Sequence, residues 1–140
     1  MIRMSKKVET VITLMKRAER KGVAIKRARQ RDMWGVGELQ EVYRVENNGK
    51  TVSLYHYETL TAKVDLENMQ LIEVYGESRS DSDSVATFLS ELGFKNFNFG
   101  FKPVNGGFWL FTNKDGERQE VYLDEHGEIA VIHEFNRVQA

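Results

Sequence analysis

The side chains best suited to chemistry in this 140-residue sequence are a group of cations followed by an aromatic ring. Arginine and lysine hold phosphate groups, and an aromatic ring can stack on a base, so the combination is typical of nucleic-acid binding. The same composition also occurs on solvated edges that bind nothing. We expect a surface for a polyanion or protein partner formed by Lys16, Arg17, Arg20, Lys21, Lys26, Arg27, Arg29, Arg31 and Trp34.

The net charge of −1 conceals a division of charge along the chain. Residues 1–32 hold eleven basic and three acidic side chains, a net charge of +8, whereas the other 108 residues hold nine basic and eighteen acidic ones, a net charge of −9. This asymmetry indicates either a surface for a nucleic acid or acidic partner, or a basic segment that lies against the acidic remainder and neutralises it. The sequence leaves both alternatives open.

A second candidate site is a pocket for a small anionic ligand. Tyr55, Tyr57 and Tyr75 are expected to form a ring cluster that faces solvent, because their strand neighbours already supply an apolar face. Arg79 follows at the entry to a helix, whose N-terminus also attracts anions. Rings and an arginine together favour a nucleotide as the ligand, although two aspartates already place negative charge there.

No set of catalytic residues stands out. The chain has no cysteine, which excludes disulfides, a thiolate nucleophile and a thiolate metal site. His56, His126 and His133 lack the spacing of a metal-binding motif, and the chain has neither a dinucleotide loop nor a phosphate loop. We therefore expect no catalytic residue, no metal site and no cofactor. An enzyme that uses His133 and Glu134 is the minority hypothesis.

The hydropathy pattern predicts a protein without membrane spans. No apolar run approaches the roughly 18 residues that a span needs, and no apolar segment precedes a cleavage site for secretion. A basic helix at the N-terminus could lie on a membrane surface, but it lacks the Trp or Phe anchors that strengthen such binding. A cytoplasmic protein is the expectation.

Two helices are predicted to position these residues. Apolar side chains recur at helical spacing between Ser5 and Lys21, and Gly22 stands where that helix would end. A second apolar stripe defines a helix near residues 82–92, with capping aspartates and serines at 80–83 and Gly93 at its end. About three turns of helix are not stable alone in water, so this helix must pack on a sheet.

The rest of the chain is rich in strand signals. From Val23 an alternation predicts a strand with one basic face, a short helix being the rival, and residues 39–75 read as a meander with a turn at 47–49. Further strands are predicted at 97–101, 108–112, 118–123 and 128–135. Because strands outnumber helices and do not alternate with them, we predict an α+β fold with antiparallel sheets, in a single domain over residues 1–140 with a basic helical segment at 1–32.

A resemblance adds to these expectations. Residues 53–93, SLYHYETLTAKVDLENMQLIEVYGESRSDSDSVATFLSELG, contain an aromatic strand, a Thr-Leu strand leading to an Asp, a Tyr-Gly and a Ser-Asp-rich helix entry. This block resembles small accessory proteins of tailed phages and prophages. The resemblance implies a non-enzymatic protein that acts stoichiometrically on a host macromolecule in the host cytoplasm, such as an anti-CRISPR-like inhibitor of a nucleic-acid-guided defence nuclease.

The partner expected on this basis is a host protein or a ribonucleoprotein. Nucleic acid would be contacted through residues 16–31, and the acidic remainder would imitate nucleic acid. Two alternatives are a sponge that sequesters a nucleotide signal and a nucleic-acid-binding regulator that uses the basic segment. A homo-oligomer is compatible with each of these hypotheses.

Overall fold

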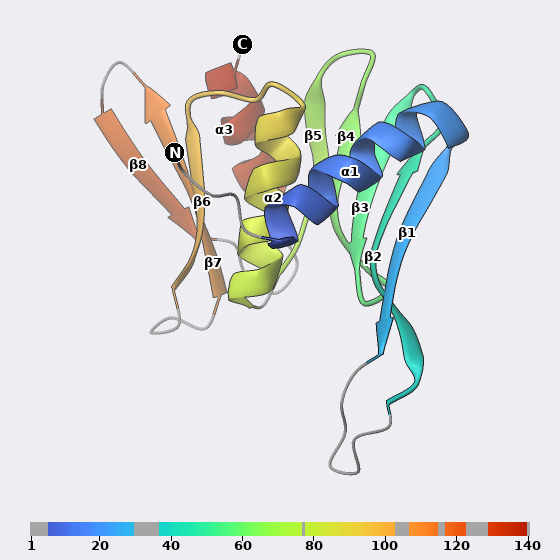
Figure 1. Ribbon diagram of the computed structural model, residues 1–140. Helices are drawn as coiled ribbons and strands as arrows, with labels where there is room; N and C mark the ends of the chain where they lie inside the picture. Colours follow the sequence, from blue (N-terminus) through green and yellow to red (C-terminus); the bar gives the residue numbers. More distant parts are fainter. Residues whose placement is uncertain are drawn as a thin grey trace, which may run out of the picture.

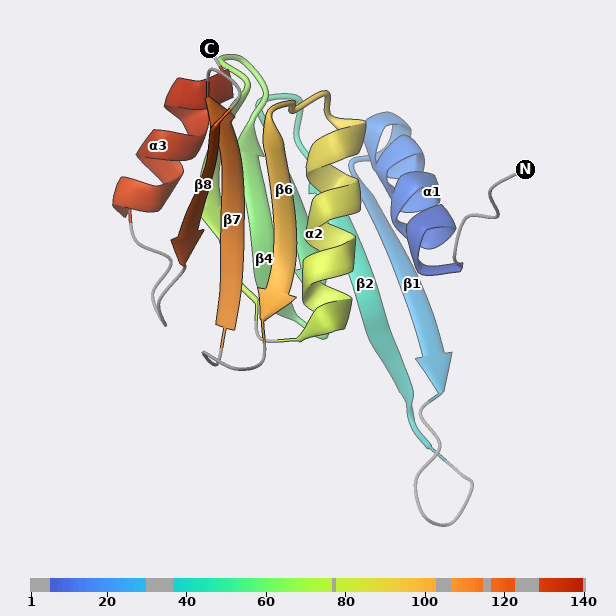
Figure 2. The same cartoon turned by 90° about the vertical axis from the view of Figure 1, so that its left-hand side faces the viewer.

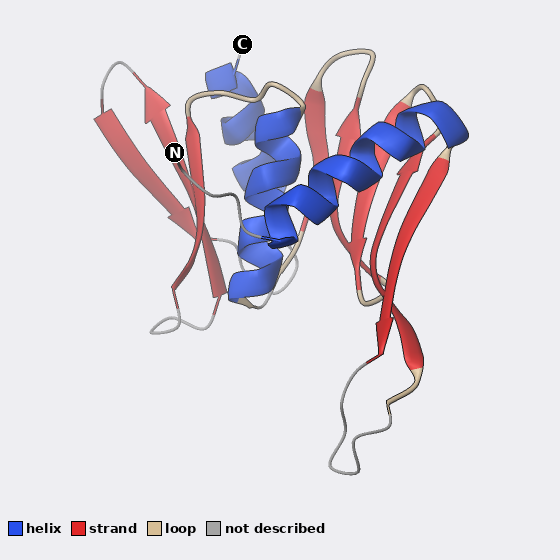
Figure 3. Ribbon diagram, in the orientation of Figure 1, coloured by secondary structure: helices blue, strands red, loops and turns tan. Residues whose placement is uncertain are grey.

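The computed structural model describes residues 6–29, 37–76, 78–102, 107–114, 117–122 and 129–139. In these residues the chain forms two antiparallel sheets and three helices, which confirms the predicted α+β class (Figures 1 and 3). The elements follow in the order α1 (Lys6–Lys21), β1 (Val23–Arg29), β2 (Leu39–Asn47), β3 (Thr51–His56), β4 (Thr59–Asp65), β5 (Gln70–Val74), α2 (Arg79–Glu91), β6 (Phe97–Lys102), β7 (Gly107–Lys114), β8 (Glu117–Tyr122) and α3 (Ile129–Gln139).

The larger sheet is a meander of five strands in the order β1-β2-β3-β4-β5. Short turns connect consecutive strands from β2 onward, and the register pairs Asn47 with Val52 across the first of these turns. The Asn48 side chain accepts hydrogen bonds from the backbone of Lys50 and Thr51, which fixes the turn. The predicted meander is therefore confirmed, and the strand that leads into it runs from Val23 to Arg29 as expected.

The smaller sheet has the order β6-β7-β8, and helices α2 and α3 lie between the two sheets (Figure 1). Helix α2 contacts β3 and β4 of the larger sheet and β6 of the smaller one, and α3 contacts β5 and β7. Helix α1 contacts β1, β2 and α2. Each sheet therefore packs against helices.

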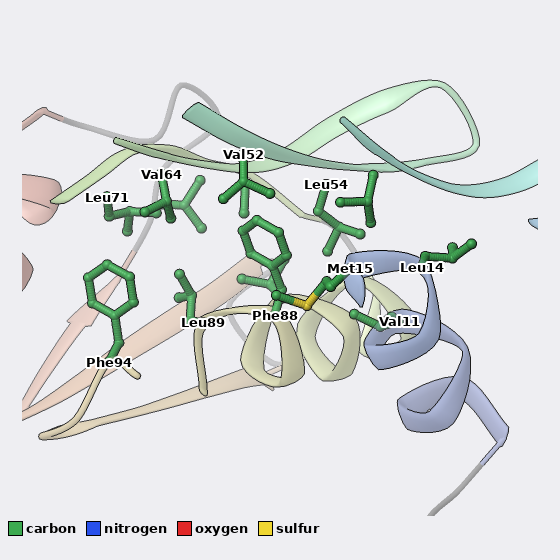
Figure 4. Packing of buried hydrophobic residues seen from close by; sticks show 14 of the residues in the cluster. Val11, Leu14, Met15, Val52, Leu54, Val64, Leu71, Phe88, Leu89 and Phe94 are labelled. Atoms are coloured by element: carbon green, nitrogen blue, oxygen red, sulfur yellow. The ribbon is translucent and has the colours of Figure 1, made fainter. Parts of the chain in front are cut away.

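The core lies where α1 and α2 meet the larger sheet (Figure 4). Phe88 and Leu89 of α2 are fully buried beneath Val52, Leu54 and the neighbouring strand β4. Burial of apolar surface at about 25 cal/mol per Å² is the main source of stability in such a layer. The predicted helical stripe therefore faces the sheet, as its short length required.

Helix α2 begins at Arg79, earlier than the predicted start near residue 82. Its N-cap is Ser78, whose hydroxyl accepts a hydrogen bond from the backbone N–H of Asp81 at 3.2 Å. Residues 80–83, which the sequence assigned to the cap, lie inside the helix. The predicted C-terminal end is confirmed, since Gly93 adopts a positive φ of 95° after the last turn.

The prediction of a final strand at 128–135 is wrong, because residues 129–139 form helix α3. Ile132 and Phe135 are buried on one face of this helix, and the Phe135 ring meets Phe94 and Phe97 with centroids 5.4 Å away. The Asn136 side chain donates to the carbonyl of Leu71 and accepts from its N–H, both at 2.9 Å. This side chain replaces a strand partner at the edge of β5, an interaction that only the tertiary fold provides.

Candidate functional site

Seven of the predicted cations lie on two neighbouring elements. We call this set the basic edge: Lys16, Arg17, Arg20 and Lys21 on α1, with Lys26, Arg27 and Arg29 on β1. All seven side chains are exposed. They gather at one margin of the molecule because β1 is the first strand of its sheet and α1 packs over β1 and β2. Arg31 and Trp34 lie outside the described residues.

Few acids neutralise this charge. Arg27 approaches Glu41 at 3.6 Å, but Glu41 also pairs with Arg44 at 3.1 Å. Arg29 donates only to the carbonyl oxygen of Gly37, at 3.5 Å. Within the described part of the chain, no ion pair forms at the other five positions of the basic edge.

Two of these arginines stand on a projecting ribbon. The last pair between β2 and β3 joins Tyr43 to His56, so residues 39–41 of β2 pair only with residues 27–29 of β1. The two strands extend past the rest of the sheet in Figures 1 and 2. Arg27 and Arg29 therefore lie on a two-stranded arm that reaches away from the core.

The structure also forms a cleft between the β3–β4 turn and the start of α2. We call it the aromatic cleft; its volume is about 680 Å³, and its walls are Val42, Tyr43, His56, Tyr57, Thr59, Tyr75, Ser78, Ser80 and Asp81. Of the predicted pocket residues, the cleft brings together Tyr57 and Tyr75. Tyr55 lies in a separate hollow beside Ser53 and Lys63, with the Arg44 guanidinium 5.1 Å from its ring centre. Arg79 is exposed and does not line the cleft.

In the wall of the cleft, His56 and Asp81 form a close pair that sequence reasoning missed. His56 Nδ1 lies 2.5 Å from Asp81 Oδ1, and the two side chains are only 10% and 14% exposed. The Tyr43 ring stacks on the imidazole with centroids 4.6 Å apart, and the Tyr57 ring lies 4.5 Å away on a tilted plane. The sequence did indicate that His56 faces the core, because it shares a strand face with the buried Val52 and Leu54. Nothing in the sequence identified Asp81 as its partner.

The cleft is a negatively charged environment. Burial raises the pKa of Tyr43 to about 12; the charges of Asp81 and Asp83 add to this shift, and a hydrogen bond with Ser84 opposes it. Burial is the largest cause of the shift, and the two carboxylates add to it because nearby negative charge disfavours a phenolate. An anionic ligand would meet the same repulsion.

The residues of the minority enzyme hypothesis do not form a pair in the structure. His133 is exposed on α3, and Glu134 pairs with Arg137 at 2.5 Å. Nowhere in the described ranges do three His, Cys, Asp or Glu side chains gather closely enough to hold a metal ion. Among the described helices, none combines the length and the apolar character of a membrane span.

Comparison with known proteins gives no family for this α+β chain: no family model, curated protein or solved structure matches it.

Proposed function

We propose that this is a non-enzymatic binding protein whose basic edge holds a polyanionic macromolecule, a nucleic acid or a ribonucleoprotein. The observation that carries the proposal is the set of exposed cations on α1 and β1, five of which make no ion pair with a described residue. Exposed cations that form no ion pair with a described residue are available to phosphate groups, and their field steers a polyanion toward the edge.

Part of this positive charge lies on the two-stranded arm, which extends away from the core. Arg27 and Arg29 stand on a ribbon that projects past the sheet, whereas the cations of α1 are held on a helix packed against the core. A polyanion that runs along the edge would therefore meet a fixed row of cations and a separate pair farther out. Such contacts position a backbone without reading its sequence.

The narrower hypothesis is a stoichiometric inhibitor of a nucleic-acid-guided defence nuclease. Its support is the resemblance of residues 53–93 to phage accessory proteins, together with the division of charge along the chain. The observations favour a polyanion surface at the basic edge over the alternative of a nucleotide sponge. Arg79 is not in the cleft, Tyr55 is elsewhere, and Asp81 gives the cleft a negative charge.

The first test is purification of the tagged protein from a bacterial lysate, with and without nuclease treatment. We expect an excess of absorbance at 260 nm that nuclease removes, or a ribonucleoprotein that co-elutes. A clean protein partner that survives nuclease would instead favour inhibition through a protein surface. Metal-dependent turnover of a nucleic acid would contradict the non-enzymatic proposal.

The second test measures the salt dependence of binding to a labelled single strand. Replacing Arg27, Arg29 and Arg31 by Ala, or Lys16, Arg17 and Arg20 by Ala, should weaken binding and reduce the slope of log K against log salt by about 0.7 for each phosphate that is no longer bound. Lys50→Ala with Lys95→Ala is the matched control, because these two exposed lysines lie outside the basic edge. Unchanged affinity and slope in both triple variants would overturn the assignment.

A further inference from the structure

The aromatic cleft has the composition of a site for a positively charged group. Its walls carry the rings of Tyr57 and Tyr75 and the imidazole of His56. The negative face of an aromatic ring attracts an ammonium or guanidinium group within about 6 Å of the ring centre. The described residues that line the cleft include no lysine or arginine.

A carboxylate stands beside the rings. Asp81 Oδ1 lies 2.5 Å from His56 Nδ1, and this contact fixes the position of the carboxylate. Since the Asp81 side chain is 14% exposed, water screens it less than it screens a surface acid.

The position of Tyr57 gives a third and independent argument. His56 pairs with Thr59, so Tyr57 and Glu58 are the two central residues of the β3–β4 turn, and both have positive φ, at 48° and 67°. Such turns favour Asn-Gly, because a side chain beyond asparagine is strained at positive φ. Strained residues persist mainly where they serve a function, and here the strain holds an aromatic ring against His56 at the mouth of the cleft.

We propose that the aromatic cleft binds an organic cation, an ammonium or guanidinium group, between the rings of Tyr57 and Tyr75 and the carboxylate of Asp81. The group belongs either to a free amine or to a lysine or arginine side chain of a protein partner, since both present the same chemistry. This site is distinct from the basic edge and carries the opposite charge, so the protein has two contact regions of opposite sign.

The test is a titration followed by the backbone amide signals of the cleft in nuclear magnetic resonance spectra. Agmatine, tetramethylammonium and a short arginine-containing peptide are the cationic probes, and adenosine monophosphate is the anionic one. We expect saturable shifts at the cleft with the cations and none with the nucleotide. Tighter binding of agmatine would assign a free amine, and tighter binding of the peptide would assign a protein side chain.

Three variants make the result specific. Asp81→Asn retains an acceptor for His56 and removes the charge, so it should weaken agmatine binding about tenfold. The double variant Tyr57→Asn with Glu58→Gly removes the aromatic ring and gives the turn residues that suit positive φ. It should weaken agmatine binding by a similar factor. Asp83→Asn is the matched control, because this exposed aspartate of the same helix does not line the cleft, and binding should change less than twofold.

Absence of saturable shifts with every cation would overturn the proposal. Equal binding by the wild type and Asp81→Asn would do the same, as would a preference for the nucleotide. The alanine variants of the basic edge should bind agmatine as the wild type does, so failure of this site and failure of the polyanion surface can be told apart.

Discussion

The basic edge and the aromatic cleft differ in how their side chains are held. At the basic edge, long cationic side chains project from α1 and β1 into solvent, with few partners among the described residues. In the cleft, His56 and Asp81 are nearly buried, and the rings of Tyr43 and Tyr57 pack against the imidazole. Substitutions at the edge should therefore cost the fold little, whereas changes in the cleft reach the core.

The largest expected effect comes from removing the support that both regions share. Phe88 is fully buried in α2, which contacts α1 on one side and carries the cleft at its N-terminus. Phe88→Ala should lower the free energy of unfolding by about 3–5 kcal/mol, measured by urea denaturation. Phe88→Leu, which keeps most of the volume, is the control and should cost less. A decrease below about 1 kcal/mol would mean that the two regions do not share this core.

The next largest effect is expected from substitution of Asp81, which tests how much the cleft contributes to the stability of the fold. Asp81→Ala should destabilise the protein by about 2 kcal/mol, because it leaves the nearly buried His56 without its partner. The matched Asp83→Ala variant should remain within about 0.5 kcal/mol of the wild type, since Asp83 is exposed. Equal thermal stability of the two variants would show that the pair contributes nothing to folding.

The pH dependence of stability follows from Tyr43. Its pKa in the folded protein is raised to about 12, so between pH 10 and 12 the unfolded chain loses the phenol proton while the folded chain retains it. Stability therefore falls as the pH rises through this window. Two full pKa units set an upper bound of about 2.7 kcal/mol, and we expect a decrease of about 1–2 kcal/mol. Tyr43→Phe should flatten the profile, and an unchanged slope in that variant would contradict the assignment.

A stabilising change would sharpen the comparison further. Tyr57→Asn with Glu58→Gly should raise the free energy of unfolding by about 1 kcal/mol. In the wild type both positions have positive φ, a conformation that asparagine and glycine adopt with less strain than tyrosine and glutamate. Thermal denaturation measures this gain, and Glu58→Gly alone should give part of it. A destabilised double variant would mean that ring contacts of Tyr57 outweigh the strain of the turn.

The smallest effect on stability is expected at the basic edge. Arg17→Ala, Arg20→Ala and Lys21→Ala together should change the free energy of unfolding by less than about 0.5 kcal/mol, since all three side chains are exposed. Denaturation in low and high salt is the measurement. A destabilisation that grows at low salt would reveal ion pairs within the protein and would break the contrast between the two regions.

Most of the secondary structure could be predicted from the sequence, because periodicity is a local property. The stripe on α1, the alternation of the meander and the glycine after α2 each depend on a few neighbouring residues. The predicted start of α2 is wrong because several serines and aspartates near residue 80 are equally suited to capping, and packing selected Ser78. The prediction at 128–135 is wrong because the apolar residues there fit both periods, and contacts of Phe135 with Phe94 and Phe97 favour the helix.

The basic edge and the aromatic cleft also differ in how far the sequence could predict them. The cations of the basic edge could be predicted residue by residue, since charge belongs to a segment and exposed cations need no partner to be recognised. The aromatic cleft could be predicted only in part, because His56 and Asp81 lie 25 positions apart and meet only after α2 packs on the sheet. The sequence by itself determined where the charge lies and, for most segments, whether the segment is helical or extended. The tertiary structure alone decided which rings and carboxylates converge, because that depends on how separate elements pack against a common core.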